Sequence, residues 1–597
     1  MSPTRPMAIG LAWLIAATLS TGASAGQVLV TKLGEVASLA DLAKSHANRE
    51  ALLAPNPAKT EMPRHLMPDG KPQTTQPPLS TLPLEAPPID AHRAPSPVNF
   101  TGLSFADGQS LGAGVIEPSD MGLAANNHQV VQAVNLALKV LSDIGAQVVA
   151  PVSLYTFFNV PNQQPQIPYF LSDPVVLFDQ YGGTDSFCVS ACGRFIVTAL
   201  ITDFNIFNAI LVAVSKTSDA TGGYFLYMVS AQLGNSQCAA NTCLADFPKV
   251  GYDANGIYLT ADLFAADGSG AFVGAAIYAL PKAALEAGAN NAFQISALGE
   301  VFPAEFVIVP MVPALGEPSP AANGGTMYFQ TARNIMDGSR TVRTFAIYNT
   351  SQLNGGNPAL MTLATADETA PQYNPTVFMT QPQDLSAGPE CTSAGYTKPP
   401  ALQGGYNSLA PNVVLASGNL FGAIPTGARD ASGLAVNQIL VLITRPTPGA
   451  ANPPALATRV ATAARLSGSM IGTGISLGYP SFALKTDPTS LVGASGVLSF
   501  SFVGNSSTTT PPGFPSVGAI AFSGNPVSVS VLTFSGTEVA DGFTCATGAE
   551  RWGDYSMSAV DAVTGTFFSG MEFTPGGLPT GQQANWGTGI IATSGIP

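Results

Sequence analysis

Short runs of apolar residues, separated by turn residues, recur along most of the chain. The clearest set lies between residues 173 and 230, where four runs follow one another: DPVVLFDQ, GRFIVTALI, AILVAVS and YFLYMVS. Runs of this length, rich in β-branched and aromatic residues and bounded by glycine, predict strands. Four of them in succession predict one antiparallel meander.

Similar sets recur on both sides of this one and give seven units in all. Repeated four-stranded units predict a β-propeller, so the expected fold is all-β, with seven four-stranded antiparallel blades over residues 97–597. The last unit has only three evident strands. We therefore expect SPVNFTGLSFA, residues 96–106, to supply its fourth strand and to leave no sheet edge open.

Residues 1–96 have a different pattern. Residues 1–25 have the layout of a signal peptide, with Arg5, an apolar run and an Ala-Ser-Ala cleavage site. Residues 26–96 carry a short helical pattern and then a Pro-rich stretch, which predicts a flexible arm: a propeptide, a spacer or a wrapping arm. No later apolar run is long enough to span a membrane. We expect export to the medium, the periplasm or the cell surface.

Charged residues make up only 10% of the chain, and the formal net charge is −14. An acidic surface disfavours nucleic acid and anionic membranes as partners. We expect a monomer that binds an extracellular glycan or protein. The chain has six cysteines, an even number that predicts disulfides in an exported protein, although 15 pairings exist. The simplest pairing is Cys188 with Cys192, Cys238 with Cys243, and Cys391 with Cys545.

Four segments give the chain a family resemblance: SDPVVLFD with GRFIVTALI, DFPKVGYDANGIYLTADLF, YPSFALKTD and RWGDYSMSAVDAVTG. They resemble secreted bacterial β-propellers related to the Asp-box, sialidase-like propellers. TSDATGGY, residues 217–224, is similar to a degenerate Asp box in which Tyr224 replaces tryptophan. Asp boxes stabilise turns, and the arginine triad of a sialidase cannot be assigned in this chain. The resemblance therefore implies the fold and not the activity.

Histidine is scarce where the blades are expected. His46, His65 and His92 lie in the arm, and His128 is alone in the repeats. Catalysis by a histidine base, or a zinc site with several histidines, is therefore disfavoured. We expect no cofactor, with Ca²⁺ as the one alternative.

Carboxylates are the better candidates. Asp120, Asp173, Asp246 and Asp554 each stand at the start of a unit, where the innermost strand of a blade begins. They could meet on one rim of the central channel and bind Ca²⁺, or act with Tyr555 as an acid and base for glycosidic cleavage. Alternatively, each accepts hydrogen bonds from the backbone of its own turn.

The last unit contains further candidates for ligand binding. Trp552 and Trp586 are the only tryptophans after the signal peptide, and Arg551, Tyr555 and Glu572 are near them in the predicted blade. Exposed tryptophans with polar neighbours suit stacking on sugar rings. The alternative is that both pack between the first and last blades.

The sequence therefore favours a binding protein that recognises a glycan or a protein through one face of a propeller. The alternative is a hydrolase or lyase that uses these carboxylates, with Arg551 and Tyr555, on a polysaccharide or a similar substrate. The two differ in one structural feature. An enzyme needs carboxyl groups that face one open pocket, about 5 to 9.5 Å apart.

Overall fold

The computed structural model describes most of the chain after the predicted signal peptide, which lies outside the described residues. The described residues are 27–50, 59–61, 82–85, 92–93, 97–112, 115–160, 169–183, 192–203, 208–231, 243–265, 269–289, 293–296, 301–302, 305–333, 340–355, 357–405, 409, 411–450, 454–524, 527–576 and 583–596. Within these ranges, no helix is long and apolar enough to cross a membrane.

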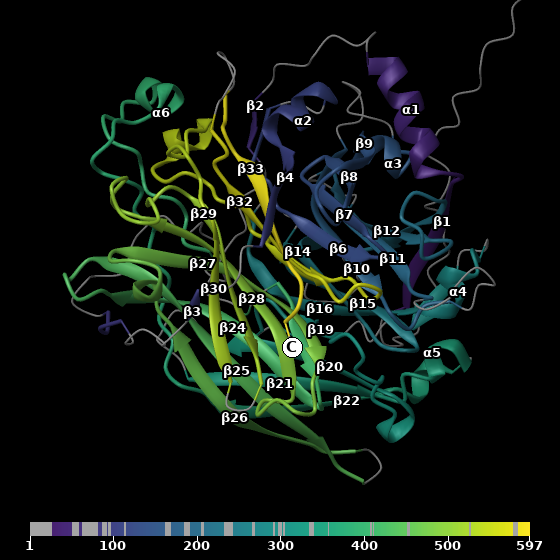
Figure 1. The fold of residues 1–597 in the computed structure, drawn as a ribbon. Helices are drawn as coiled ribbons and strands as arrows, with labels where there is room; N and C mark the ends of the chain where they lie inside the picture. Colours follow the sequence, from purple (N-terminus) through teal and green to yellow (C-terminus); the bar gives the residue numbers. More distant parts are fainter. Residues whose placement is uncertain are drawn as a thin grey trace, which may run out of the picture.

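The structure is all-β and consists mainly of four-stranded antiparallel meanders, as the sequence predicted (Figure 1). In chain order the meanders are β6 (Gly122–Asn126), β7 (Gln129–Val134), β8 (Ala137–Ser142) and β9 (Gln147–Ser153); β10 (Phe170–Asp179), β11 (Arg194–Thr202), β12 (Asn208–Ser215) and β13 (Tyr224–Ser230); β14 (Cys243–Tyr252), β15 (Gly256–Ala265), β16 (Phe272–Pro281) and β18 (Val301–Phe302); β19 (Val309–Pro313), β20 (Thr326–Arg333), β21 (Thr341–Tyr348) and β22 (Thr362–Thr369); β23 (Val413–Ala416), β24 (Asn419–Arg429), β25 (Ala435–Pro448) and β26 (Leu456–Leu466); β27 (Ile475–Thr486), β28 (Ala494–Gly504), β29 (Ser516–Ser523) and β30 (Ser528–Phe534); and β31 (Met557–Val560), β32 (Phe567–Phe573) and β33 (Gly587–Thr593) with β4 (Val98–Ser104).

The first strands of the meanders surround a common axis. Each contacts the first strand of the next meander, in the order β6, β10, β14, β19, β23, β27 and β31, and β31 contacts β6 again. Both faces of most meanders are thereby covered by neighbours. The strands consequently read as almost continuous apolar runs, and all ten residues of β15 are buried.

One sheet departs from the simple repeat. β19 pairs in parallel with β23, with Met311 opposite Val413, so two meanders join into one eight-stranded sheet. The edge strands of this sheet, β22 and β26, contact each other, and the sheet is almost closed into a barrel.

The expected closing strand is present. β4 pairs antiparallel with β33, with Thr101 opposite Gly589 and Phe100 opposite Ile590. A segment from the N-terminal part of the chain and the last strand therefore share one sheet, which leaves β33 no open edge.

Described parts of residues 26–96 lie along the sheets, and they include a short helix. β1 (Gln27–Val36) is inserted between β13 and β17 (Phe293–Ser296), and α1 (Leu39–Glu50) contacts β9 (Figure 1). Sheet edges expose unpaired N–H and C=O groups, and β1 pairs with them at β13. Two shorter strands of the arm also pair in parallel with later strands, namely β2 (Lys59–Glu61) with β5 (Val115–Glu117) and β3 (His92–Arg93) with β30.

The remaining helices are short and lie in connections. They are α2 (Phe105–Ser110), α3 (Leu154–Phe157), α4 (Lys282–Glu286), α5 (Gln352–Gly355) and α6 (Pro389–Ser393), with 3-10 turns η3 (Ala322–Gly324), η5 (Pro358–Leu360), η6 (Gly468–Met470) and η7 (Phe543–Thr547). The two connections that matter for the site are residues 370–412, which carry α6, and residues 535–556, which carry η7. α6 and η7 contact each other.

Candidate functional site

The predicted aspartates come together from separate sheets. Near the start of β6, β10, β14 and β31, one residue has a left-handed backbone: φ is 44° at Asp120, 54° at Asp173, 53° at Phe247 and 75° at Gly553. Non-glycine residues rarely adopt this conformation, which costs about 1 to 3 kcal/mol and persists only where its surroundings hold it. In β10 and β14 the same position is a bulge in the strand register.

The aspartates hydrogen-bond across sheets and not only within their own turns. Asp120 Oδ1 accepts from the backbone N–H of Asp554 at 2.5 Å, and Asp120 Oδ2 accepts from Asn135 Nδ2 at 2.6 Å. Asn135 Oδ1 in turn accepts from the backbone N–H of Asp173 at 3.1 Å. The set therefore converges, and the alternative in which each aspartate serves only its own turn is wrong for Asp120.

Tyr555 and Arg551 complete these contacts. The hydroxyl oxygen of Tyr555 lies 2.9 Å from Asp173 Oδ2 and 3.1 Å from the carbonyl oxygen of Pro248, and its single proton is shared between these two acceptors. Arg551 Nη2 is 2.8 Å from Asp554 Oδ2, and both side chains are buried. We call Asp120, Asp173, Asp246, Asp554, Arg551, Tyr555, Glu572, Asn135 and Lys249 the carboxylate network.

Glu572 belongs to the same network through Ser119. Its Oε2 accepts from the backbone N–H of Ser119 at 3.3 Å and also from the Ser119 hydroxyl. Burial first, and then neighbouring carboxylates, raise the pKa of Glu572 to about 8 and that of Asp173 to about 7. Burial also raises the pKa of Asp120 well above its usual range. The network therefore holds protons at neutral pH.

Lys249 is the residue that sequence reasoning missed. It follows Asp246 by three positions, in DFPK, and its Nζ lies 3.9 Å from the centroid of the Tyr555 ring without a hydrogen-bond partner. Burial lowers the pKa of Lys249 to about 7, although the carboxylates of Asp173 and its neighbours oppose that shift. The available signal was a charged residue directly before the buried run VGY in a chain with few charges.

Most of the network is closed to solvent. Asp120 is 1% exposed, Asp173 7% and Asp554 8%, whereas Asp246 is partly exposed, so three of the four aspartates do not face an open pocket. The two long connections pack beside them: the backbone N–H of Gln403 donates to the carbonyl oxygen of Glu550 at 2.9 Å, next to Arg551. In this state of the molecule, the described residues of the network therefore contain no pair of carboxyl groups that faces an open pocket. The hydrolase hypothesis requires such a pair.

The tryptophans are buried, which corrects their interpretation as exposed sugar-stacking residues. Trp552 packs in an apolar cluster with Met379, Leu402 and Tyr479. Trp586 Nε1 donates to the carbonyl oxygen of Ile116 at 2.9 Å, and its ring meets Phe105 edge to face. Trp586 thus packs between segments that adjoin the first and last blades, as the alternative expected, whereas Trp552 packs against β27, β28 and the connections and not between those blades.

The expected bridge between Cys391 and Cys545 is absent. Both are free thiols with no solvent exposure, one on α6 and one on η7. A hydrogen bond to Cys545, and then burial, raises the pKa of the Cys391 thiol. Cys192 and Cys243 are each disulfide-bonded, whereas Cys188 and Cys238 lie outside the described residues.

No group of three or more His, Cys, Asp or Glu side chains is arranged to hold a metal ion in the part of the chain that the structure describes.

A cavity runs along the common axis, lined by residues of all the first strands. Its volume is about 560 Å³, and most of its walls are apolar. The lining includes Leu123, Leu177, Val312, Val414, Leu484 and Met557, with Ala562 among the other lining residues. The polar side chains of Gln180 and Tyr252 also contribute.

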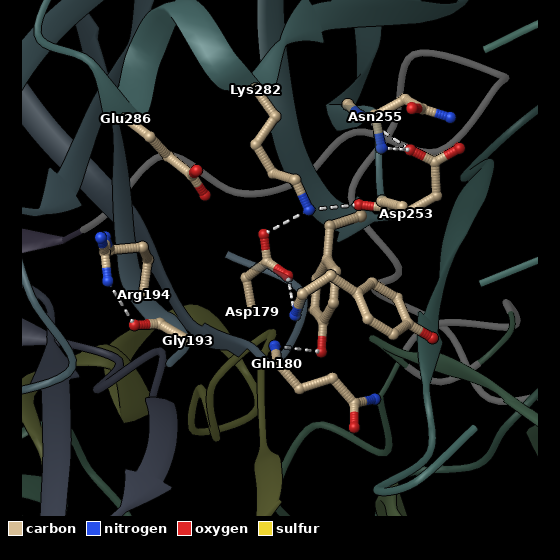
Figure 2. A network of polar contacts seen from close by, with 12 residues as sticks. Asp179, Gln180, Gly193, Arg194, Asp253, Asn255, Lys282 and Glu286 are labelled. Atoms are coloured by element: carbon tan, nitrogen blue, oxygen red, sulfur yellow. Dashed lines mark hydrogen bonds and ion pairs between the residues drawn. The ribbon is translucent and has the colours of Figure 1, made fainter. Parts of the chain in front are cut away.

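A second buried polar network lies beside Gln180 and Tyr252 (Figure 2). Lys282 Nζ is 2.8 Å from Asp179 Oδ2 and donates to the carbonyl oxygen of Asp253 at 2.5 Å. The side chains of Asp179 and Lys282 are only 1% and 3% exposed. This ion pair fixes α4 against the end of β10, and so holds one wall of the axial cavity in place.

Comparison with known proteins gives only weak likenesses. No family model matches the chain, and no curated protein matches it. Among solved structures, the extracellular domains 1–2 of Drosophila semaphorin 1a are 8% identical, over 84% of this chain and 88% of that one, with a TM-score of 0.33. A protein described as a glycoside hydrolase is 10% identical, over 59% and 88%, with a TM-score of 0.26. Similarity this low carries no argument about activity.

Proposed function

We propose that the chain is an exported seven-bladed β-propeller that acts as a binding protein for an extracellular ligand. The seven first strands that contact one another in a ring support the blade count. The signal-peptide layout of residues 1–25 supports export.

One observation carries the choice of binding over catalysis. Asp120, Asp173, Asp554 and Glu572 are buried, and they direct oxygens to Asn135, Tyr555, Arg551, Ser119 and the backbone of Asp554. A pair of carboxyl groups that cleaves a glycosidic bond must instead face the substrate. The network is better explained as a set of contacts that fixes four consecutive blades around the axis.

The axial cavity favours a protein ligand over a glycan. Most of its lining is apolar, and its polar side chains are Gln180, Tyr252, Asn412 and Ser558. These four groups cannot pair with all the hydroxyls of a sugar, and a buried hydroxyl without a hydrogen bond costs about 1 to 3 kcal/mol. An apolar side chain pays no such cost and gains about 1.5 to 3 kcal/mol on full burial. We therefore infer a peptide segment that inserts a bulky apolar residue.

The test is a selection on the mature protein with a displayed peptide library, with a glycan array in parallel. We expect peptides with a Leu, Met or Phe anchor and no glycan binding. Ala562→Trp narrows the cavity, because Ala562 lines it, and should abolish peptide binding. Val563→Trp is the matched control, because Val563 is 43% exposed and does not line the cavity. Glycan binding that Ala562→Trp leaves unchanged would contradict the proposal.

A carboxylate-dependent hydrolase or lyase acting on a polysaccharide is the second candidate. Lys249 with a pKa of about 7 and Asp173 with a pKa of about 7 lie in one network, and groups that titrate near neutrality suit acid and base catalysis. This activity requires the connections 370–412 and 535–556 to move off the network. The assay incubates the protein with a panel of polysaccharides and measures reducing sugars and unsaturated products. Release of such products that is lost in Asp173→Asn would support this activity. If no polysaccharide in the panel releases product, the activity is rejected.

A further inference from the structure

A second cavity lies between the blade formed by β23–β26 and the blade formed by β27–β30. The space enclosed by its walls and mouth is about 680 Å³. Thr462 is the only lining residue with a polar side chain. The walls include Phe421, Ile443, Leu466, Ile520 and Phe522.

The β26 side of this cavity is accessible from solvent. Thr462, Ala463 and Ala464 line it and are all exposed. Leu491, next to the lining residue Val492, is 68% exposed, which is unusual for a large apolar side chain. A ligand can therefore enter from this side, and it meets apolar surface first.

Two arginines stand at one end of the cavity. Arg445 and Arg459 are directly opposite each other in the β25–β26 pairing, and both are exposed. Neither forms an ion pair with any residue that the structure describes. Directly opposed like charges repel across a sheet, so this pair favours an anion between them.

The arginines share a face with the cavity. Ile443 and Thr462 are opposite each other and both line it. The pairing is irregular here because β26 has one extra residue, Ala461, opposite the step from Ile443 to Thr444. β25 has no extra residue, so Arg445, two positions after Ile443, is on the same face, about 7 Å further along the strand. Positive charge therefore continues directly from the end of the apolar walls.

The geometry points to a binding site for a free fatty acid, with the alkyl chain between the blades and the carboxylate on Arg445 and Arg459. The apolar walls match a hydrocarbon chain and offer a sugar almost no hydrogen bonds. Two guanidinium groups match a carboxylate. The site lies between two blades and not on the axis, so it does not depend on the proposed peptide binding.

Isothermal titration of the mature protein tests this site with laurate, octanoate and dodecanol as probes. We expect saturable binding of laurate and at least tenfold weaker binding of octanoate, because each buried methylene strengthens binding about fourfold. The double variant Arg445→Gln with Arg459→Gln should weaken laurate binding about three- to tenfold and leave dodecanol binding unchanged. Arg340→Gln, an exposed arginine outside the cavity, should change neither.

A second pair of variants tests the cavity itself. Ala464→Trp fills it from the exposed side and should abolish binding of both laurate and dodecanol, whereas Ala461→Trp, on the same strand but outside the lining, should retain it. Thermal melts of all variants establish that they fold. The assignment is overturned if the unsubstituted protein does not bind laurate saturably. It is also overturned if Ala464→Trp binds laurate as well as the unsubstituted protein does, or if the protein binds only to anionic phospholipid vesicles.

Discussion

Glu572→Gln tests the buried carboxylate network through its protons. Glu572 has a pKa raised to about 8 in the fold, mainly by burial, against 4.5 for the exposed group. Between these values the folded chain holds a proton that the unfolded chain has lost. Unfolding therefore releases a proton, and the free energy of unfolding falls as pH rises, by about 1.4 kcal/mol per pH unit for this one group.

From pH 5 to pH 7 this slope amounts to roughly 3 kcal/mol. Glutamine has nearly the same shape and does not titrate, so Glu572→Gln should remove this part of the pH dependence while the other raised carboxyls keep theirs. The assay is urea denaturation at pH 5, 6 and 7, compared with Glu538→Gln at an exposed position. A pH dependence in Glu572→Gln equal to that of the unsubstituted protein would refute the reasoning.

Three further predictions concern other buried groups. Lys249→Met should raise the pKa of Asp173 above about 7, because the positive charge of Lys249 lowers that pKa. Infrared spectra recorded across pH follow the band of the protonated carboxyl group. If that band has the same pH dependence in Lys249→Met as in the unsubstituted protein, the prediction is wrong. Lys282→Met should cost roughly 3 to 5 kcal/mol by leaving Asp179 buried without its cation, and adding Asp179→Leu should recover most of that loss in denaturation experiments. If the destabilisation of the double variant equals the sum of the destabilisations of the two single variants, the ion pair between Lys282 and Asp179 is refuted as their interaction. Finally, thiol titration without reductant should detect the two thiols of Cys391 and Cys545 only after the protein is unfolded, because both are buried. If no thiol is detected after unfolding, the two cysteines form a disulfide bridge.

The sequence predicted the repeating meanders and the closing strand because both depend on local patterns. Four short runs bounded by turns specify a meander, and the last unit visibly lacked a strand, which β4 supplies. The convergence of Asp120, Asp173 and Asp554 followed from their equivalent places in the repeat, since equivalent places in a ring meet at one end.

The closed state of the site could not be predicted. Asn135 and Lys249 join the network only because left-handed residues and bulges redirect the strands, and these have no clear sequence signal outside glycine. The connection that carries α6 lies outside the repeated apolar pattern, yet Gln403 pairs with Glu550 next to Arg551, and Met379 and Leu402 pack on Trp552. The parallel pairing of β19 with β23 depends on contacts between units, which a pattern within one unit does not reveal.

The most direct test of the central claim compares Asp554→Asn with Ala562→Trp in one assay of ligand binding and product release. If the carboxylate network is structural and the axial cavity binds the ligand, Asp554→Asn should retain binding and Ala562→Trp should lose it. The account is contradicted if the protein releases product from a polysaccharide and this release is abolished by Asp554→Asn but unchanged by Ala562→Trp.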